Sequence, residues 1–192
     1  MDKRRLVKET LKESGRVKEK LLSETDTILK IAQWILSTVK KGGKVLLCGN
    51  GGSAADSQHI ACELVGKLSR ERKGLPALAL TTDTSILTAV SNDWGFDRVF
   101  SRQVSALGRK GDILIALSTS GRSINVLKAV EMAKERGMKT VALTGTDGGL
   151  LKGLADLTLI VPSRDVQRIQ EAHITIGHIL SDLVEREILK IQ

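Results

Sequence analysis

The chain has 192 residues, of which 30 are lysine or arginine and 22 are aspartate or glutamate, so its formal net charge is +8. This length suits one domain with a sizeable buried core. No stretch approaches the roughly 20 apolar residues that cross a membrane, and no apolar segment of the signal-peptide type follows the charged start of the chain. We therefore expect a cytoplasmic protein that has no membrane partner.

The basic excess suits anionic ligands, but its distribution does not favour nucleic acid. Many of the cations lie in runs mixed with acidic residues, as at residues 18–20 and 70–73, which is typical of solvated faces. Aromatic residues make up only 2% of the chain, and tyrosine is absent. The side chains on which single-stranded nucleic acid or RNA would stack are therefore missing.

The amino-terminal residues 3–41 carry apolar side chains at helical spacing. This pattern predicts two helices, or one helix that is interrupted near residues 14–15. Lysines and glycines at residues 40–43 are typical of a helix end. Short apolar runs then alternate with helical segments. Strands are expected at residues 44–48, 76–80, 112–117, 139–144 and 157–161. Helices are expected at residues 54–68, 84–92, 98–108, 123–136 and 166–190.

This alternation predicts a parallel, doubly wound sheet with helices on both of its faces. We expect residues 1–192 to form a single three-layer α/β domain. Residues 1–41 would be an N-terminal helical extension, and residues 42–192 an α/β core that ends in a helix. The apolar face of the extension has to be buried against the sheet layer or another subunit, which favours an oligomer.

The loop after the first expected strand reads Gly-Asn-Gly-Gly-Ser and starts at Gly49. Its glycines let backbone N–H groups approach an anion, Ser53 adds a hydroxyl group, and the start of the next helix adds partial positive charge. The same residues fit a loose dinucleotide pattern, Gly49-x-Gly51-x-x-Ala54. That pattern expects a ribose-binding acid about 20 residues further on, and Asp83 lies farther away. A nicotinamide cofactor is therefore the less favoured interpretation.

A second polar loop, residues 118–123, reads Ser-Thr-Ser-Gly-Arg-Ser and lies between the third expected strand and a helix. An ordinary helix cap needs one hydroxyl group, whereas this loop has four. We therefore expect it to bind a tetrahedral anion such as phosphate. Ligands of open α/β sheets gather beyond the carboxyl ends of the strands, where both loops are expected to lie.

Two pairs of polar residues can carry chemistry near these loops. His59 and Glu63 are four residues apart on an expected helix, so they share a face and can act as an acid–base or metal-binding pair. Gln170 and His178 are eight residues apart on the last helix, which is about 80° around the axis and roughly 12 Å along it. They can border one site without touching each other. Taken alone, each histidine is more often a packing residue.

Together these residues resemble the sugar isomerase (SIS) domain family, and within it the phosphoheptose isomerases, over nearly the whole chain. The parts that match are residues 49–53, His59 with Glu63, Asn92 with Asp93, residues 118–120 with Ser123, and Gln170 with His178. The resemblance implies the SIS fold, which is flavodoxin-like with a five-stranded parallel sheet in three layers. It also implies a cytoplasmic homotetramer with active sites at subunit interfaces.

The reaction that the resemblance implies converts sedoheptulose 7-phosphate to D-glycero-D-manno-heptose 7-phosphate. This is the first step of ADP-heptose and lipopolysaccharide-core heptose synthesis. Glu63 would be the base and His178 the acid, acting through an enediol(ate). The implied substrate-binding residues are Asn50, Gly51, Gly52, Ser53, Glu63, Asn92, Asp93, Ser118, Thr119, Ser120, Ser123 and Gln170. One zinc ion per subunit is implied, with His59, Glu63, Gln170 and His178 as its ligands.

Two departures from the family pattern concern substrate positioning. Lys67 stands where many phosphoheptose isomerases are expected to have arginine, and a lysine lacks the bidentate fork. Residues 166–167, Val-Gln, lack an acid that some members carry.

Two other classes of protein remain as alternatives. One is a non-catalytic tetrameric SIS adaptor that binds the bacterial replication initiator, a branch in which the acid and base are expected to be lost. The other is a different SIS enzyme or a phosphosugar-binding regulatory domain. Such regulatory domains are commonly joined to a DNA-binding module, for which 192 residues leave little room. Because Glu63 and His178 are both present, the isomerase is the favoured interpretation.

Overall fold

The computed structural model describes residues 2–190, so residue 1 and residues 191–192 of the predicted domain lie outside the described part. Its core is a parallel five-stranded sheet with the strand order β2-β1-β3-β4-β5. The strands are β1 Val45–Cys48, β2 Ala77–Ala79, β3 Ile113–Ser118, β4 Lys139–Gly145 and β5 Leu157–Val161. The α/β class and the five predicted strands are confirmed, although β2 is two residues shorter than expected.

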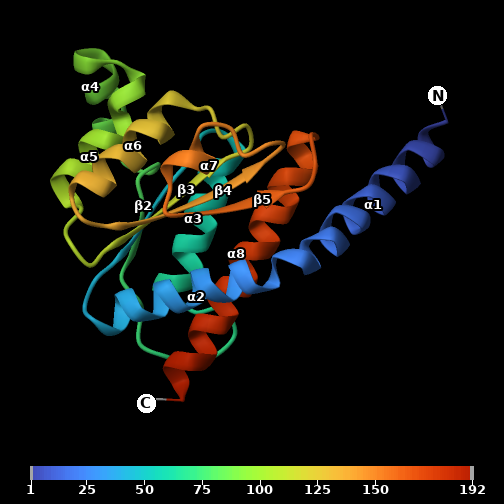
Figure 1. Ribbon diagram of the computed structural model, residues 1–192, viewed down its shortest axis with the longest axis horizontal. Helices are drawn as coiled ribbons and strands as arrows, with labels where there is room; N and C mark the ends of the chain where they lie inside the picture. The colour runs from blue at the N-terminus through green and yellow to red at the C-terminus, as the bar shows by residue number, and fades with distance from the viewer. Residues whose placement is uncertain (1, 191–192) are drawn as a thin grey trace.

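Helices cover both faces of this sheet, which makes three layers (Figure 1). They are α1 Lys3–Lys20, α2 Thr25–Lys40, α3 Gly52–Val65, α4 Thr84–Trp94, α5 Val99–Leu107, α6 Ile124–Glu135, α7 Leu151–Leu154 and α8 Val166–Leu189. Two short 3-10 helices are η1 Leu21–Glu24 and η2 Phe96–Arg98. Residues of α2, α3 and α8 pack into one hydrophobic core, and residues of α4, α5, α6 and α7 pack into the other.

The two cores follow from the alternation of side chains along each strand. In β1, Val45 and Leu47 belong to the core under α2, α3 and α8, whereas Leu46 belongs to the core under α5 and α6. Every residue of β1 and β3 is buried, as expected for central strands of a parallel sheet. Because all five strands are parallel, the loops that follow them meet at one edge, where the polar loops lie.

Of the two alternatives predicted for residues 3–41, two helices are confirmed, and an interruption near residues 14–15 is wrong. Helix α1 continues through Gly15, and the break comes at η1 (Figure 1). A side chain at Gly15 would meet no atom within 4 Å, so no contact requires a glycine here. Its low helix propensity destabilises α1 by about 1 kcal/mol relative to alanine, which is too little to end the helix. The break is made instead by hydroxyl groups that bond to nearby carbonyls, Ser23 to Lys20 at 2.9 Å and Thr25 to Leu22 at 2.7 Å.

Helix α1 leads away from the body of the molecule (Figure 1). Val17 is its one buried residue within the described chain, and Leu6, Val7 and Leu11 are exposed. An apolar stripe of this kind is consistent with burial against another subunit. The oligomer nevertheless stays a prediction.

A buried ion pair holds the segment that follows α3. The Glu185 carboxylate of α8 accepts backbone hydrogen bonds from Leu68, Ser69 and Arg70 at 3.0–3.1 Å. Arg72 Nε donates to the same carboxylate at 3.2 Å, and both side chains are 0% exposed. Burial by itself would raise the pKa of Glu185, but the hydrogen bonds outweigh burial and the pKa is lowered.

The same pair explains why the predicted helix 54–68 ends early, at Val65. Arg72 Nη2 donates to the carbonyl of Glu63 at 2.7 Å, and Nη1 donates to the carbonyl of Leu64 at 2.9 Å. These last-turn carbonyls are satisfied by a guanidinium instead of by another helical turn. The end of α3, which carries Glu63, is thereby attached to α8.

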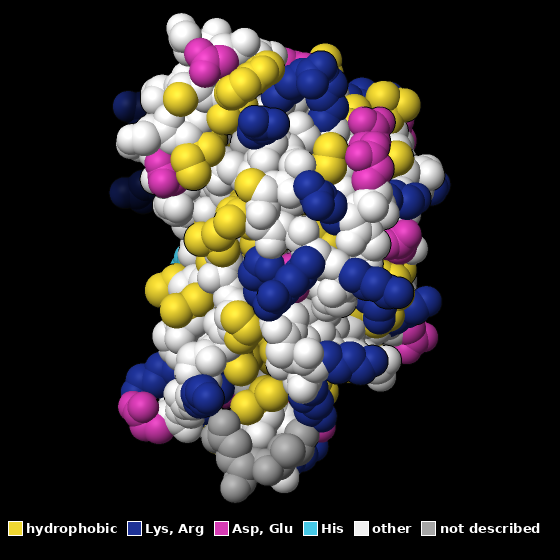
Figure 2. Space-filling model, turned by 90° about the vertical axis from the view of Figure 1, so that its left-hand side faces the viewer, with side chains coloured by type: hydrophobic (Ala, Val, Ile, Leu, Met, Phe, Trp, Pro, Cys, Tyr) yellow, Lys and Arg dark blue, Asp and Glu magenta, His cyan; other side chains and the backbone are white. Residues whose placement is uncertain are grey.

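Charged side chains are spread over the face that Figure 2 shows rather than gathered on it. On the face in Figure 2, the Lys and Arg side chains form separate groups among hydrophobic and acidic side chains. This arrangement agrees with the mixed, solvated runs seen in the sequence. Among residues 2–190, no helix is long and apolar enough to cross a membrane.

His173 of α8 is a buried histidine that sequence analysis gave no role. Its Nε2 lies 3.2 Å from the Thr144 carbonyl, so Nε2–H donates to that oxygen. Burial lowers the pKa of His173 to about 4, and the hydrogen bond to Thr144 offsets part of this effect. The side chain therefore stays neutral in the folded protein well below pH 6.

This lowered pKa predicts a loss of stability in acid. As the pH falls from about 6.5 to about 4, the unfolded chain takes up a proton that folded His173 cannot, so the free energy of unfolding falls by up to about 1.4 kcal/mol per pH unit. We expect His173→Asn to remove this contribution to the pH dependence of the free energy of unfolding. Urea unfolding at pH 7, 6 and 5 measures that dependence. Equal slopes in the parent and in His173→Asn would contradict the prediction.

Candidate active site

The first polar loop leads from the end of β1 directly into α3. Gly51 has φ +54°, a left-handed conformation that favours glycine, and it is the N-cap of α3. A Cβ on Gly52 would come within 2.4 Å of Gln170 Nε2, so the absence of a side chain there lets α8 approach the loop. Ser53 follows in the first turn and is buried. Helix α3 thus begins two residues earlier than predicted, at the glycines themselves.

The second polar loop follows β3, the neighbour of β1 in the sheet. Ser118 Oγ and Ser123 Oγ lie 3.1 Å apart, and Ser120 Oγ accepts the backbone N–H two residues later at 3.2 Å. Gly121, at φ +64°, packs against the loop after β4, because a Cβ there would meet the Gly148 carbonyl oxygen at 2.0 Å. The four hydroxyl residues of this loop are Ser118, Thr119, Ser120 and Ser123. Both predicted anion loops therefore lie side by side beyond the carboxyl ends of β1 and β3.

A pair of side-chain amides joins these loops. Asn50 and Asn125 exchange two hydrogen bonds, at 2.9 and 2.8 Å. Asn125 lies in the first turn of α6 and is buried. Sequence analysis missed it, because an asparagine near a helix start gives no signal of a partner 75 residues away. The predicted contact of Asn50 with substrate stays a prediction, since each amide keeps a further hydrogen and lone pair.

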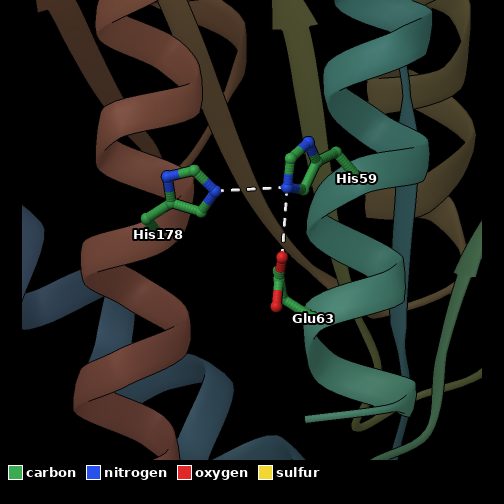
Figure 3. Close-up of side chains that lie close together, drawn as sticks. All are labelled: His59, Glu63 and His178. Atoms are coloured by element: carbon green, nitrogen blue, oxygen red, sulfur yellow. Dashed lines mark hydrogen bonds and ion pairs between the residues drawn. The ribbon is translucent and has the colours of Figure 1, made fainter. Parts of the chain in front are cut away.

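His59, Glu63 and His178 come together between α3 and α8 (Figure 3). His59 Nε2 lies 3.1 Å from Glu63 Oε1 and 3.2 Å from His178 Nε2. The side chain of His59 is 47% exposed and that of Glu63 is 17% exposed, so solvent can reach the cluster. The predicted helical face shared by His59 and Glu63 is present, and packing of α3 on α8 adds His178 to it.

This cluster has the donor set of a metal site. One proton on His59 Nε2 cannot serve both the carboxylate and the second imidazole, whereas a cation at a shared point lets all three atoms be ligands. Ligand atoms of tetrahedral zinc, bound at about 2.0–2.1 Å, lie about 3.3 Å apart, close to the spacing observed. All three ligand atoms lie within 4.8 Å of one another. Two histidines and a glutamate fit a catalytic zinc site with an open position.

Asp56 lies on α3, one turn before His59. Burial raises the pKa of Asp56 to about 6, and the charge of His59 lowers it in part. Within the described residues its Oδ2 atom is buried and has no hydrogen-bond partner. Sequence analysis noted Asp56 only as part of a helix start.

The remaining predicted site residues lie apart from the cluster. Gln170 contacts the loop at Gly52, about 12 Å along α8 from His178. Asn92 and Asp93 are exposed on α4, hydrogen-bonded to each other at 2.9 Å, and α4 packs against α5 and η2. The structure therefore does not bring these three residues to the His59 cluster within one chain.

The other residues weighed in the sequence, Asp83, Lys67 and residues 166–167, have local structural roles. Asp83 accepts the backbone N–H of Ile86 at 2.9 Å as the N-cap of α4, so its carboxylate already has a structural partner. Lys67 forms an exposed ion pair with Glu71. Residues 166–167 begin α8, which is capped by Asp165.

The comparisons with known proteins agree with this geometry. Residues 11–145 match the family model of the SIS domain. A phosphoheptose isomerase of Helicobacter pylori (strain P12) is 54% identical over 179 residues, which cover 93% of each chain. The structure of a phosphoheptose isomerase from Neisseria gonorrhoeae is similar with a TM-score of 0.91 and 45% identity, covering 95% of this chain and 98% of that one.

A second solved structure, a phosphoheptose isomerase from Francisella tularensis, has a TM-score of 0.94 and 39% identity, covering 97% of this chain and all of that one. The similarity thus extends through both anion loops, the His59 cluster and the helical extension. The chain belongs to the SIS domain family and, within it, to the phosphoheptose isomerases, a group of isomerase enzymes.

Proposed function

We propose that this isomerase converts sedoheptulose 7-phosphate to D-glycero-D-manno-heptose 7-phosphate, the first step of ADP-heptose and lipopolysaccharide-core heptose synthesis. The observation that carries the proposal is the cluster of His59, Glu63 and His178, on the same two helices that reach the anion loops. A carboxylate and an imidazole are the groups that move protons near neutral pH. The relatives named phosphoheptose isomerase support the substrate class.

In this mechanism Glu63 removes a proton from C1 of the open-chain ketose. The C1–C2 double bond forms as the C2 carbonyl electrons move onto O2, which takes a proton from His178. The enediol then collapses: His178 recovers a proton from O1, and Glu63 delivers its proton to C2, which leaves an aldehyde at C1. Both groups end in their starting states, and each is expected to contribute about 10²–10⁴ in rate.

The phosphate would be held at the two loops, by the hydroxyl groups of Ser53, Ser118, Ser120 and Ser123 and by the backbone at Gly51 and Gly52. Asn92, Asp93, Thr119 and Gln170 would position sugar hydroxyls, whereas the side chain of Asn50 is hydrogen-bonded to Asn125. Ser53 and Glu63 are ten residues apart on α3, about 15 Å along its axis. A substrate held by both in one chain must therefore lie extended along α3, which suits a seven-carbon chain with a terminal phosphate.

His59, Glu63 and His178 would hold one zinc ion per subunit, as their donor set allows. Zinc bound there would polarise or orient a substrate oxygen. Helical side chains lean toward the N-terminus of their helix, so Gln170 leans away from His178. Gln170, the fourth zinc ligand predicted from the sequence, could therefore reach this site only as Gln170 of a partner subunit.

A shared site of this kind fits the proposed homotetramer with active sites at subunit interfaces. Asn92 and Asp93, which lie on the outlying α4, would reach a neighbouring subunit's site (Figure 1). Residues 1–192 are proposed as one SIS domain, with residues 1–41 as the extension used in assembly, in a cytoplasmic enzyme. The replication-initiator adaptor is not favoured, because the acid and the base are both present.

The test is turnover by the purified protein of sedoheptulose 7-phosphate, followed by NMR as aldoheptose phosphate, with metal content measured on the same sample. We expect turnover and about one zinc per subunit. A tetrameric, zinc-loaded sample that leaves sedoheptulose 7-phosphate unchanged would contradict the proposed reaction. Turnover without bound metal would contradict the zinc proposal alone.

A further inference from the structure

Two asparagine side chains, Asn50 and Asn125, link the loops that carry the hydroxyl groups. Asn50 Nδ2 donates to Asn125 Oδ1 at 2.9 Å, and Asn125 Nδ2 donates to Asn50 Oδ1 at 2.8 Å. Each amide gives one hydrogen and accepts one, so the two hydrogen bonds close a ring. An ionised carboxylate can only accept and a methyl group can do neither, so this ring needs an amide at both positions.

The ring connects the turns at the ends of two neighbouring strands. The backbone carbonyl of Asn50 accepts the N–H of Ser53 at 2.9 Å, which closes the first turn. Asn125 lies two residues after Ser123, the N-cap of α6, whose Oγ is 3.1 Å from Ser118 Oγ. The amide pair therefore ties the turn that carries Ser53 to the loop that carries the other serines.

Because this amide pair is partly buried, the two loops are held at the distance at which both hydrogen bonds form. Asn125 is only 4% exposed, and a buried amide that loses its partner is costly. Hydrogen bonds to a phosphate oxygen need donor–acceptor distances of about 2.6–3.2 Å, so two loops can share one phosphate only within a narrow range of spacing. The two amide hydrogen bonds hold the loops at a fixed spacing in the protein without ligand, so this spacing need not be set when phosphate binds.

We propose that the Asn50–Asn125 pair is a positioning element, which sets the spacing of the two loops so that both contact one phosphate group. Asn50 then acts through Asn125 and not by contact with a sugar hydroxyl. This inference rests on the proposed function, which puts the substrate phosphate between these loops.

Inorganic phosphate separates the two possible roles of Asn50, because it has no sugar hydroxyl. Its Kd is measured by calorimetry for the parent, Asn50→Ala, Asn125→Ala and the double variant. Each variant is expected to raise this Kd about tenfold, and the double variant is expected to bind no more weakly than the single ones. KM for sedoheptulose 7-phosphate should rise by a similar factor, with a smaller change in kcat.

Gln103 provides a matched control, since it is a buried amide whose hydrogen bonds go to the carbonyls of Leu80 and Val99, at 2.9 Å, and not to residues of either loop. Gln103→Ala should lower the melting temperature and leave the Kd for inorganic phosphate at the parent value. That result would separate loss of a buried amide from loss of loop spacing.

Two results would overturn the proposal. In one, Asn50→Ala binds inorganic phosphate like the parent while KM for the sugar phosphate rises, which assigns Asn50 to a hydroxyl. In the other, the two single effects on Kd multiply in the double variant. If Asn125→Ala does not fold, Asn50→Ala, at a partly exposed position, still tests the proposal. Its Kd for inorganic phosphate and its KM for the sugar phosphate are then compared with those of the parent. A parent that fails to bind inorganic phosphate would instead contradict the phosphate site of the proposed function, and this proposal with it.

Discussion

Replacing Glu63 by glutamine is expected to lower kcat for the isomerisation by about 10²–10⁴-fold, since glutamine keeps the shape of the side chain and cannot take up a proton. KM should change much less, because the proposed phosphate site lies about 15 Å away at the other end of α3. In D₂O, the variant should also stop solvent exchange of the C1 hydrogen of the ketose and of the C2 hydrogen of the aldose. NMR of substrate and product measures both effects on one sample.

The metal content of the same variant separates the two proposed roles of Glu63. A full metal load with a collapsed kcat assigns Glu63 to proton transfer, whereas loss of metal together with kcat assigns it to the metal site. Glu131→Gln removes the same charge at an exposed position of α6 and should keep the parent kcat. A Glu63→Gln variant with nearly parent turnover would contradict both roles.

Replacing Glu185 by glutamine is expected to lower the free energy of unfolding by about 3–5 kcal/mol. The carboxylate accepts three backbone N–H groups and Arg72 Nε, and a glutamine cannot satisfy all of them, because one of its two acceptor positions becomes an NH₂ group. The variant would also leave the fully buried Arg72 without a counter-charge. Urea unfolding at pH 7 measures the loss.

The pH dependence of this loss has a definite sign. The pKa of Glu185 is lowered in the folded protein, so its contribution is complete above its ordinary value of 4.5 and is lost as the pH falls below it. Parent and Glu185→Gln should therefore converge in acid. Glu187→Gln, two residues further along α8, breaks only an exposed ion pair with Lys190 and should cost much less stability. Equal losses in the two variants would refute a special role for Glu185.

The two variants are also connected through α3. Arg72 is bound to Glu185 and also donates to the carbonyl of Glu63. The Arg72–Glu185 ion pair therefore fixes the end of α3 that carries the proposed base. A Glu185→Gln protein that still folds is therefore expected to show a lower kcat as well, by less than Glu63→Gln. Circular dichroism at the assay temperature confirms that the sample is folded.

Most of the fold could be predicted because it depends on patterns among residues close together in the sequence. Strand and helix periodicity depends on neighbours within a few positions, so the five strands, the alternation of elements and the α/β class followed from the sequence. The short α7 was missed, since four residues are too few to show a helical period. The break in the N-terminal helix was misplaced, because Gly15 looked like a breaker but is exposed and tolerated.

For the candidate site, the sequence by itself determined the two anion loops, one rich in glycine and one in hydroxyl groups, and the shared face of His59 and Glu63, because each depends on spacing within one loop or helix. Only the tertiary structure decided which distant groups complete them. His178 joins His59 across 119 positions, Asn125 joins Asn50 across 75, and Glu185 joins Arg72 across 113. Such pairs depend on how α3, α6 and α8 pack against the sheet. That packing places side chains through contacts between whole elements, and no local pattern records it.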